Sequence, residues 1–213
     1  GAYDGFELAV RAVLGQQVSV AAASTFAGRL AARYGVPLPS DATDAPASAI
    51  TDTRAGATPA RAAGAITGVQ AATTPARPAG LPGLSVVFPG PEVLADADLD
   101  GLGLTTARQR TLRALATAAA HGRLTLDPGT DPGEVAARLA ELPGIGPWTT
   151  GYILMRAAAD PDAFPAADLG LRRALARLGI PPGHAARWRP WRAYAAMHLW
   201  SWPAQPEILA PAS

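Results

Sequence analysis

The sequence predicts a globular, all-α protein, and three observations support this prediction. Apolar residues recur at helical spacing in several segments that begin at a capping residue. Alternation typical of a strand is confined to a few residues near positions 84–88. Of the 213 residues, 49% are hydrophobic and 16% are charged, which is typical of a globular protein. A chain of this length can bury a substantial core as one domain or as two close-packed halves.

Two helices are predicted near the beginning of the chain. Asp4, followed three residues later by a glutamate, has the spacing of a capping box, and residues 6–14 continue as an amphipathic helix. Ser19 is placed to cap a second helix that runs to about residue 34 and closes at Gly35. We therefore interpret residues 1–36 as the first helices of the folded part.

Residues 37–83 differ in character from the rest of the chain. Of these 47 residues, 33 are Ala, Thr, Pro or Gly, and none is aromatic. Such a stretch buries too little apolar area to offset the entropy lost on ordering. We interpret it as a disordered or irregular low-complexity insertion, with the folded part resuming over residues 84–205 and a short tail at 206–213.

Further helices are expected after the insertion. Asp131 is a capping residue for one of them, and Gly122 is a stop signal for another. The predicted helices cover residues 91–96, 106–121, 135–142, 169–178 and 190–200.

Residues 142–147, with the sequence Leu-Pro-Gly-Ile-Gly-Pro, predict a tight turn between two helices. Gly144 and Gly146 can take the positive φ that such a turn needs, and Pro147 suits the first position of the next helix. Backbone N–H groups at this helix N-terminus would suit a phosphate oxygen. The alternative is an ordinary helical hairpin, and local spacing alone does not decide between them.

Asp168 stands at the entry to a predicted helix. Aspartate is a preferred helix cap, and that alone would explain it. A functional role is compatible with capping, because a helix N-terminus lowers the pKa of a carboxyl group and keeps it ionised. An ionised carboxylate can stabilise a developing cationic sugar or orient a water molecule.

The composition excludes several kinds of chemistry. The chain has no cysteine, which excludes disulfides, thiolate zinc sites and cysteine-bound iron–sulfur clusters. It also has no lysine, which excludes a lysine Schiff base. The three histidines lack the spacing of metal ligands. These absences favour a cytoplasmic protein without a tightly bound transition metal.

Charge is unevenly distributed along the chain. All 18 basic residues are arginine, and residues 169–206 contain six of them without an acidic residue. Such an excess would favour a polyanionic partner. Chance clustering in an Ala- and Arg-rich sequence is the alternative.

Taken together, these motifs resemble the helix-hairpin-helix (HhH-GPD) DNA glycosylase superfamily, and above all its alkylbase branch, DNA-3-methyladenine glycosylase II. Four separated segments carry the resemblance in the right order. They are residues 6–19 with Ala-Val-Leu-Gly-Gln-Gln-Val-Ser, residues 142–149 with Leu-Pro-Gly-Ile-Gly-Pro-Trp-Thr, the Pro-flanked loop ending at Asp168, and residues 188–200. The resemblance covers most of the chain except 37–83.

The resemblance implies two packed helical subdomains and a base-excision site. In this family an aspartate matching Asp168 stabilises the oxocarbenium-like transition state and helps water to attack C1′. The residues matching the family's aromatic cleft for the flipped base are Trp148, Tyr152 and Trp200. Aromatic faces attract positive charge and stack on bases, which suits a cationic alkylated purine.

The resemblance also implies how DNA is held. The hairpin would grip a backbone phosphate through its N–H groups, and its residues are Leu142, Pro143, Gly144, Ile145 and Gly146. In the family, hairpin carbonyls also hold a monovalent cation, here those of Ala140, Leu142 and Ile145. Gln17 matches the wedge that fills the gap left by the extruded base.

Trp148 stands where bifunctional members of the superfamily carry their Schiff-base lysine. The resemblance therefore implies a monofunctional enzyme without AP-lyase activity, without an iron–sulfur cluster and without a required cofactor. Its partner would be double-stranded DNA containing alkylated bases, bound by a monomer at the nucleoid and not at a membrane. The family's branch often has a further domain upstream. The rival hypothesis is a non-catalytic helix-hairpin-helix DNA-binding module, and a helical protein-interaction domain is a third.

Overall fold

The computed structural model of the chain describes residues 3–38 and 86–201. Within these ranges the chain is helical apart from two short strands, β1 (Val36–Pro37) and β2 (Val86–Val87), which form a two-stranded sheet. The predicted all-α class is therefore confirmed. Apart from its first two residues, the predicted insertion at 37–83 lies outside the described residues, as does the predicted tail at 206–213.

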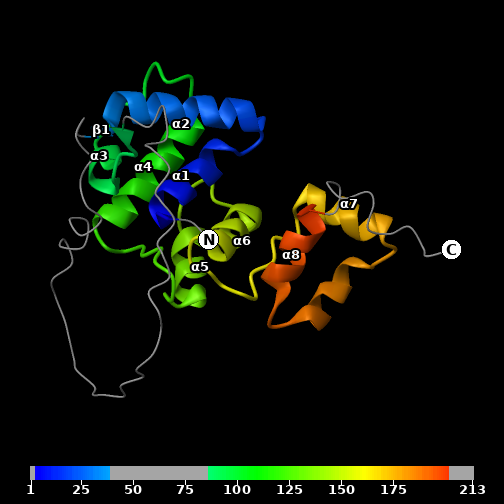
Figure 1. Ribbon diagram of the computed structural model, residues 1–213. Helices are drawn as coiled ribbons and strands as arrows, with labels where there is room; N and C mark the ends of the chain where they lie inside the picture. The colour runs from blue at the N-terminus through cyan, green and yellow to red at the C-terminus, as the bar shows by residue number, and fades with distance from the viewer. Residues whose placement is uncertain (1–2, 39–85, 202–213) are drawn as a thin grey trace, which may run out of the picture. The chain divides into compact units, whose positions relative to one another are not determined.

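Most of the described chain is helical (Figure 1). They are α1 (Gly5–Leu14), α2 (Val20–Tyr34), α3 (Pro91–Ala95), α4 (Thr106–Ala120), α5 (Pro132–Ala140), α6 (Pro147–Arg156), α7 (Leu169–Arg177), the 3₁₀ helix η2 (Pro182–Trp188) and α8 (Arg192–Ser201).

The predicted capping residues begin their helices. The Asp4 carboxylate accepts a hydrogen bond from the Glu7 backbone N–H at 2.9 Å, and the Ser19 hydroxyl accepts one from Ala22 at 3.2 Å. The side chain of Glu7 accepts a bond from Arg11 at 2.7 Å, one turn further along α1. Each cap satisfies an N–H group that the first turn of a helix leaves without a partner.

Several predicted boundaries are wrong. Helix α5 begins at Pro132, not at residue 135, because proline is well accommodated in the first turn after the Asp131 cap. Helix α8 begins at Arg192, two residues later than predicted. Neither strand β1 nor helix η2 was predicted from the sequence. A 3₁₀ helix repeats every three residues, so its apolar spacing differs from that of an α-helix.

The larger hydrophobic core lies among helices α1 to α6. Its fully buried side chains include Val10, Leu30, Leu115, Leu139 and Ile153. Burying one such side chain stabilises the fold by about 1.5–3 kcal/mol. This core fixes α6 against α1 and α5, which are in contact with it.

A second, smaller core lies among the end of α6, α7 and α8. Leu171, Leu175 and Leu199 are buried in it. Tyr152 and Leu154 of α6 pack against both cores. Helix α6 therefore belongs to both groups of helices, as expected for two packed helical subdomains.

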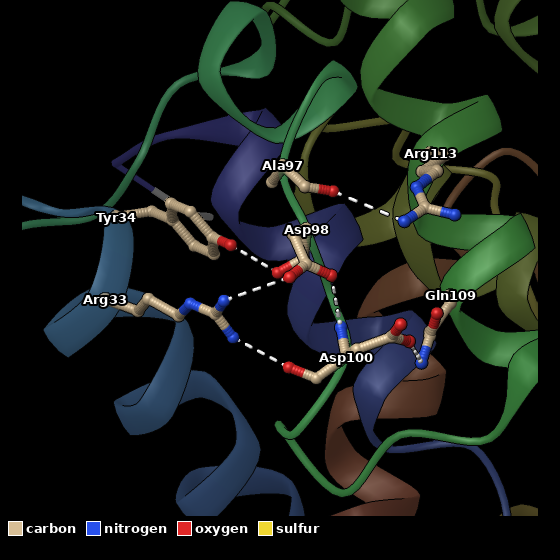
Figure 2. Close-up of polar contacts among 7 residues, drawn as sticks. All are labelled: Arg33, Tyr34, Ala97, Asp98, Asp100, Gln109 and Arg113. Carbon is tan, nitrogen blue, oxygen red and sulfur yellow. Dashed lines mark hydrogen bonds and ion pairs between the residues drawn. The ribbon is translucent and has the colours of Figure 1, made fainter.

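Polar contacts hold the loop between α3 and α4 (Figure 2). Arg33 of α2 donates to the Asp98 carboxylate at 3.2 Å and to the Asp100 carbonyl at 2.7 Å, and the Tyr34 hydroxyl donates to the Asp98 carbonyl. Gln109 of α4 donates to the Asp100 carboxylate at 3.2 Å. The backbone N–H of Asp100, followed by the charge of Arg33, holds the pKa of Asp98 below its usual value. The loop is thereby tied to both α2 and α4.

Candidate active site

Three helices bring N–H donors to the carboxylate of Asp168. As predicted, Asp168 caps α7, and its Oδ1 accepts from the Leu171 backbone N–H at 2.9 Å. The indole Nε1–H of Trp200, on α8, donates to the same oxygen at 2.9 Å. The indole Nε1–H of Trp148, on α6, donates to Oδ2 at 2.8 Å. Two side chains, one 20 positions before Asp168 and the other 32 positions after it, thus meet at its carboxylate.

These hydrogen bonds keep Asp168 ionised. Partial burial raises the pKa of the carboxyl group, but the hydrogen bonds from Trp200, Leu171 and Trp148, with a further one from the Gly170 backbone, outweigh burial. The net effect holds the pKa of Asp168 below its usual value. Asp168 itself is half-buried.

The three predicted cleft aromatics lie together beside this carboxylate. Trp148 and Tyr152, one helical turn apart, stack with ring centroids 5.5 Å apart and an interplanar angle of 15°. Tyr152 and Trp200 are tilted at 52° with centroids 6.2 Å apart. All three side chains are half-buried. The structure therefore brings the four predicted residues into one cluster, which we call the Asp168 cluster.

Two glycines that sequence reasoning missed permit this packing. A Cβ at Gly170 would lie 3.0 Å from Asp168 Oδ1 and 3.4 Å from the Trp200 ring. A Cβ at Gly151 would lie 3.2 Å from the backbone of Pro165. A methyl group at either position would force its neighbour to shift by a few tenths of an ångström. Nothing in the local sequence distinguished these glycines from others in helices.

The hairpin at residues 142–146 joins α5 to α6 by a tight turn. Gly144 has a φ of +78° as predicted, and a Cβ there would collide with the hydroxyl of Thr111 on α4. The same prediction is wrong for Gly146, whose φ is −101° because it caps α6 in the extended conformation normal for a helix cap. The Ile145 N–H donates to the Leu142 carbonyl at 3.3 Å, and Pro147 begins α6.

The loop between α1 and α2 lies against this hairpin. Gln17, the predicted wedge, is exposed and has a φ of +56°, a left-handed conformation that a glutamine rarely adopts. The preceding residue, Gln16, donates from its amide to the Gly144 carbonyl at 3.0 Å and to the Thr149 hydroxyl at 2.9 Å. Sequence reasoning gave Gln16 no role.

An open pocket of about 380 Å³ borders the cluster. Helix α1, the start of α2 and the loop between them form most of its lining, and Trp148 with Tyr152 form its α6 side. Asp168 and Trp200 do not line it. The pocket therefore reaches the two stacked rings but not the carboxylate.

The arginine-rich segment is only partly available to a polyanion. Arg192 forms a bidentate pair with Asp162 at 2.6 and 2.7 Å, and Arg189 lies 3.4 Å from the same carboxylate. Asp162 precedes the arginine-rich segment in sequence, so counting charges within that segment missed it. Arg172, Arg173 and Arg177 are exposed on α7, the helix that Asp168 caps.

Among the described residues, no group of His, Cys, Asp and Glu side chains is arranged to bind a metal ion. Nor does any helix there have the length and apolar character needed to cross a membrane.

The family model described as "HhH-GPD superfamily base excision DNA repair protein" matches residues 10–187, and the chain therefore belongs to this superfamily.

Curated relatives extend the likeness. The chain is 42% identical over 219 residues to a "Probable bifunctional transcriptional activator/DNA repair enzyme AlkA" of Mycobacterium tuberculosis, covering 96% of this chain and 36% of that protein. It is 33% identical over 210 residues to "DNA-3-methyladenine glycosylase 2" of Escherichia coli, covering 94% of this chain and 58% of that protein. The chain thus spans between about one third and three fifths of these relatives' length.

Solved structures share the fold. A 3-methyladenine DNA-glycosylase from Archaeoglobus fulgidus superposes with a TM-score of 0.65 at 21% identity, over 98% of this chain and 61% of that one. The 3-methyladenine DNA glycosylase of Schizosaccharomyces pombe in complex with abasic DNA gives a TM-score of 0.58 at 21% identity, over 93% and 80%.

Proposed function

We propose that the protein is a monofunctional DNA glycosylase that removes alkylated purines such as 3-methyladenine from duplex DNA. The observation that carries this proposal is the Asp168 cluster, in which an ionised carboxylate lies among three aromatic rings. The curated relatives named as 3-methyladenine glycosylases support the choice of substrate.

Asp168 is the proposed catalytic group. When the bond between the base and C1′ breaks, positive charge develops on the sugar, and a fixed carboxylate stabilises it. Hydrogen bonds from Trp148 and Trp200 reach both oxygens of Asp168 and lower its basicity. We therefore assign Asp168 mainly to electrostatic stabilisation of the sugar cation and to orienting the attacking water.

Trp148, Tyr152 and Trp200 are the proposed binding surface for the flipped base. An alkylated purine carries positive charge, which the electron-rich ring faces attract. Such a base also leaves the stack and its pair at lower cost than an intact one. Both effects favour damaged over normal purines, and neither requires hydrogen bonds that are specific for one lesion.

The hairpin is the proposed grip on the DNA backbone. Gly146 and the first turn of α6 present N–H groups that have no partner within the helix, and a Cβ at Gly146 would meet no protein atom within 4 Å. A phosphate can therefore approach closely. Gln17, exposed on its left-handed backbone, is the proposed wedge.

The hairpin carbonyls also suit a monovalent cation. Ala140 is the last residue of α5, where carbonyls lack helical partners and the helix dipole is negative. Leu142 uses its carbonyl oxygen for one bond from Ile145, which leaves a lone pair. The carbonyls of Ala140, Leu142 and Ile145 would hold the ion, which would bridge to a DNA phosphate. We propose no catalytic role for it.

Strand cleavage is not part of the proposed reaction. The chain has no lysine, and Trp148 occupies the position where the resemblance places a Schiff-base lysine. We propose hydrolysis alone, with an abasic site as product, on DNA in the cytoplasm.

Release of free base is the test. Duplex DNA carrying 3-methyladenine or 7-methylguanine is incubated with the chain, and free base is measured by chromatography. We expect base release by the wild type, with strand breaks only after heating in alkali. Binding of the duplex without release would favour the non-catalytic DNA-binding module, and breaks without alkali would contradict monofunctional chemistry.

A further inference from the structure

The side chain of Gln16 joins three parts of the proposed machinery. Its amide nitrogen donates to the Gly144 carbonyl inside the hairpin at 3.0 Å and to the Thr149 hydroxyl on α6 at 2.9 Å. Its own backbone carbonyl accepts from the guanidinium of Arg108 on α4. Both hydrogens of the amide are thus used, one on each acceptor.

Each contact leads to a group with a proposed role. Gly144 is the positive-φ residue of the hairpin that grips the strand. Thr149 is buried, with 3% of its surface exposed, and directly follows Trp148, which donates to Asp168. Gln17 directly follows Gln16 and is the proposed wedge. A single half-buried glutamine thus connects the hairpin, the wedge loop and the first turn of α6.

These contacts constrain a loop that is otherwise strained. The left-handed backbone of Gln17 is strained and persists only where its surroundings hold it. Arg108 holds the carbonyl just before Gln17, and the Gln16 amide holds the loop to the hairpin. Without them the loop would relax, and the wedge would lose its fixed position relative to the gripped strand.

We propose that Gln16 is a positioning residue that couples the grip of the hairpin on the DNA strand to extrusion of the base by Gln17. This inference rests on the proposed glycosylase function. In this proposal Gln16 acts through the loop and the hairpin, and not by contact with base or sugar. When the hairpin binds a phosphate, the Gln16 amide fixes where the wedge enters the duplex.

The test replaces Gln16 by an isosteric side chain without donors. Gln16→Met is compared with the wild type in three measurements on the full chain. They are affinity for an undamaged duplex, fluorescence of a 2-aminopurine beside 7-methylguanine as a reporter of unstacking, and the single-turnover rate of base release. We expect undamaged-duplex affinity within about twofold, and extrusion and release reduced about tenfold, the size of one or two lost hydrogen bonds.

Gln109→Met is the matched control. Gln109 is also half-buried and also donates two amide bonds, to Asp100 at 3.2 Å and to the Leu104 carbonyl at 3.3 Å, but both bonds go to the loop between α3 and α4 and neither goes to the hairpin (Figure 2). It should leave extrusion unchanged. An equal loss in Gln109→Met and Gln16→Met would show a general loss of stability and overturn the coupling.

Thr149→Val provides a second variant that does not depend on Gln16→Met folding. It removes one of the two acceptors and should reduce extrusion less than Gln16→Met. The double variant should be no worse than Gln16→Met alone, because both changes break the same contact. Normal extrusion in Thr149→Val and Gln16→Met would refute the coupling. A wild type that extrudes and releases no base would refute the proposed function instead.

Discussion

The indole N–H of Trp200 can be removed while most of the ring stacking remains. Trp200→Phe retains an aromatic ring beside Tyr152 but deletes the 2.9 Å hydrogen bond to Asp168 Oδ1. A hydrogen bond to a charged group contributes roughly 1.5–3 kcal/mol, and the half-buried position of Asp168 favours the lower end. The bond is already present in the free protein, so only the part that depends on the position of the carboxylate in the transition state affects the rate, and we expect base release to fall by up to about tenfold.

The pH dependence gives a sharper readout than the rate. After burial, which raises the pKa of Asp168, the hydrogen bond from Trp200 is the largest influence and lowers it. Its loss raises that pKa. Because the carboxyl group must be ionised to stabilise the sugar cation, activity falls as the pH drops through its pKa. The acid limb of the pH–rate profile should therefore lie at higher pH in Trp200→Phe than in the wild type.

The assay is single-turnover release of 7-methylguanine from duplex DNA across a pH series, with spontaneous depurination subtracted. Trp188→Phe is the control, since Trp188 packs on the second core and against Phe164 with ring centroids 6.2 Å apart. An unshifted acid limb in Trp200→Phe, or an equal shift in Trp188→Phe, would refute the reasoning.

Three further predictions concern packing and stability. Gly170→Ala should lower base release several-fold with little change in DNA affinity, because the new Cβ would crowd Asp168 Oδ1. The control is Gly183→Ala, because a Cβ at Gly183 meets no atom within 4 Å. Gly144→Ala should weaken DNA binding and lower the melting temperature more than Gly122→Ala does. Gly122 also has a positive φ, of +66°, but a Cβ there would meet no atom within 4 Å. Equal effects of the two substitutions would mean that backbone strain, and not the collision with Thr111, accounts for the loss. The hydrogen bonds from Arg192 hold the pKa of Asp162 in the folded protein below its usual value. The pair therefore stabilises the fold fully at a pH above the pKa of aspartate in the unfolded chain, and this stabilisation is lost as the pH falls through the pKa of Asp162 in the folded protein. Asp162→Asn should lower the free energy of unfolding by about 1 kcal/mol at neutral pH and flatten its acid dependence in melting experiments.

Local chemistry made much of the fold predictable. Asp4, Ser19, Asp131 and Asp168 begin helices as their residue types and spacing indicate. Capping depends on neighbours within three residues, so the sequence contains the information directly. The 3₁₀ helix at Pro182–Trp188 and the extended φ of Gly146 were missed, because both depend on how the chain packs and not on local residue preference.

The Asp168 cluster was predictable in its members but not in its contacts. The resemblance indicated Trp148, Tyr152 and Trp200 as base-stacking residues beside Asp168. It did not indicate that the indoles of Trp148 and Trp200 both donate to the Asp168 carboxylate, because these bonds form only when three helices converge. The contacts of Gln16 reach more than a hundred residues along the chain and left no pattern in the sequence.

The role of Asp168 is the central claim, and one paired measurement tests it most directly. Asp168→Asn removes the charge, while an amide can still cap α7. The rate of base release from 7-methylguanine duplex is measured for this variant and the wild type, together with the affinity of each for undamaged duplex. We predict that release falls below detection in Asp168→Asn while affinity stays within about twofold. Release at the wild-type rate by Asp168→Asn would contradict the mechanism.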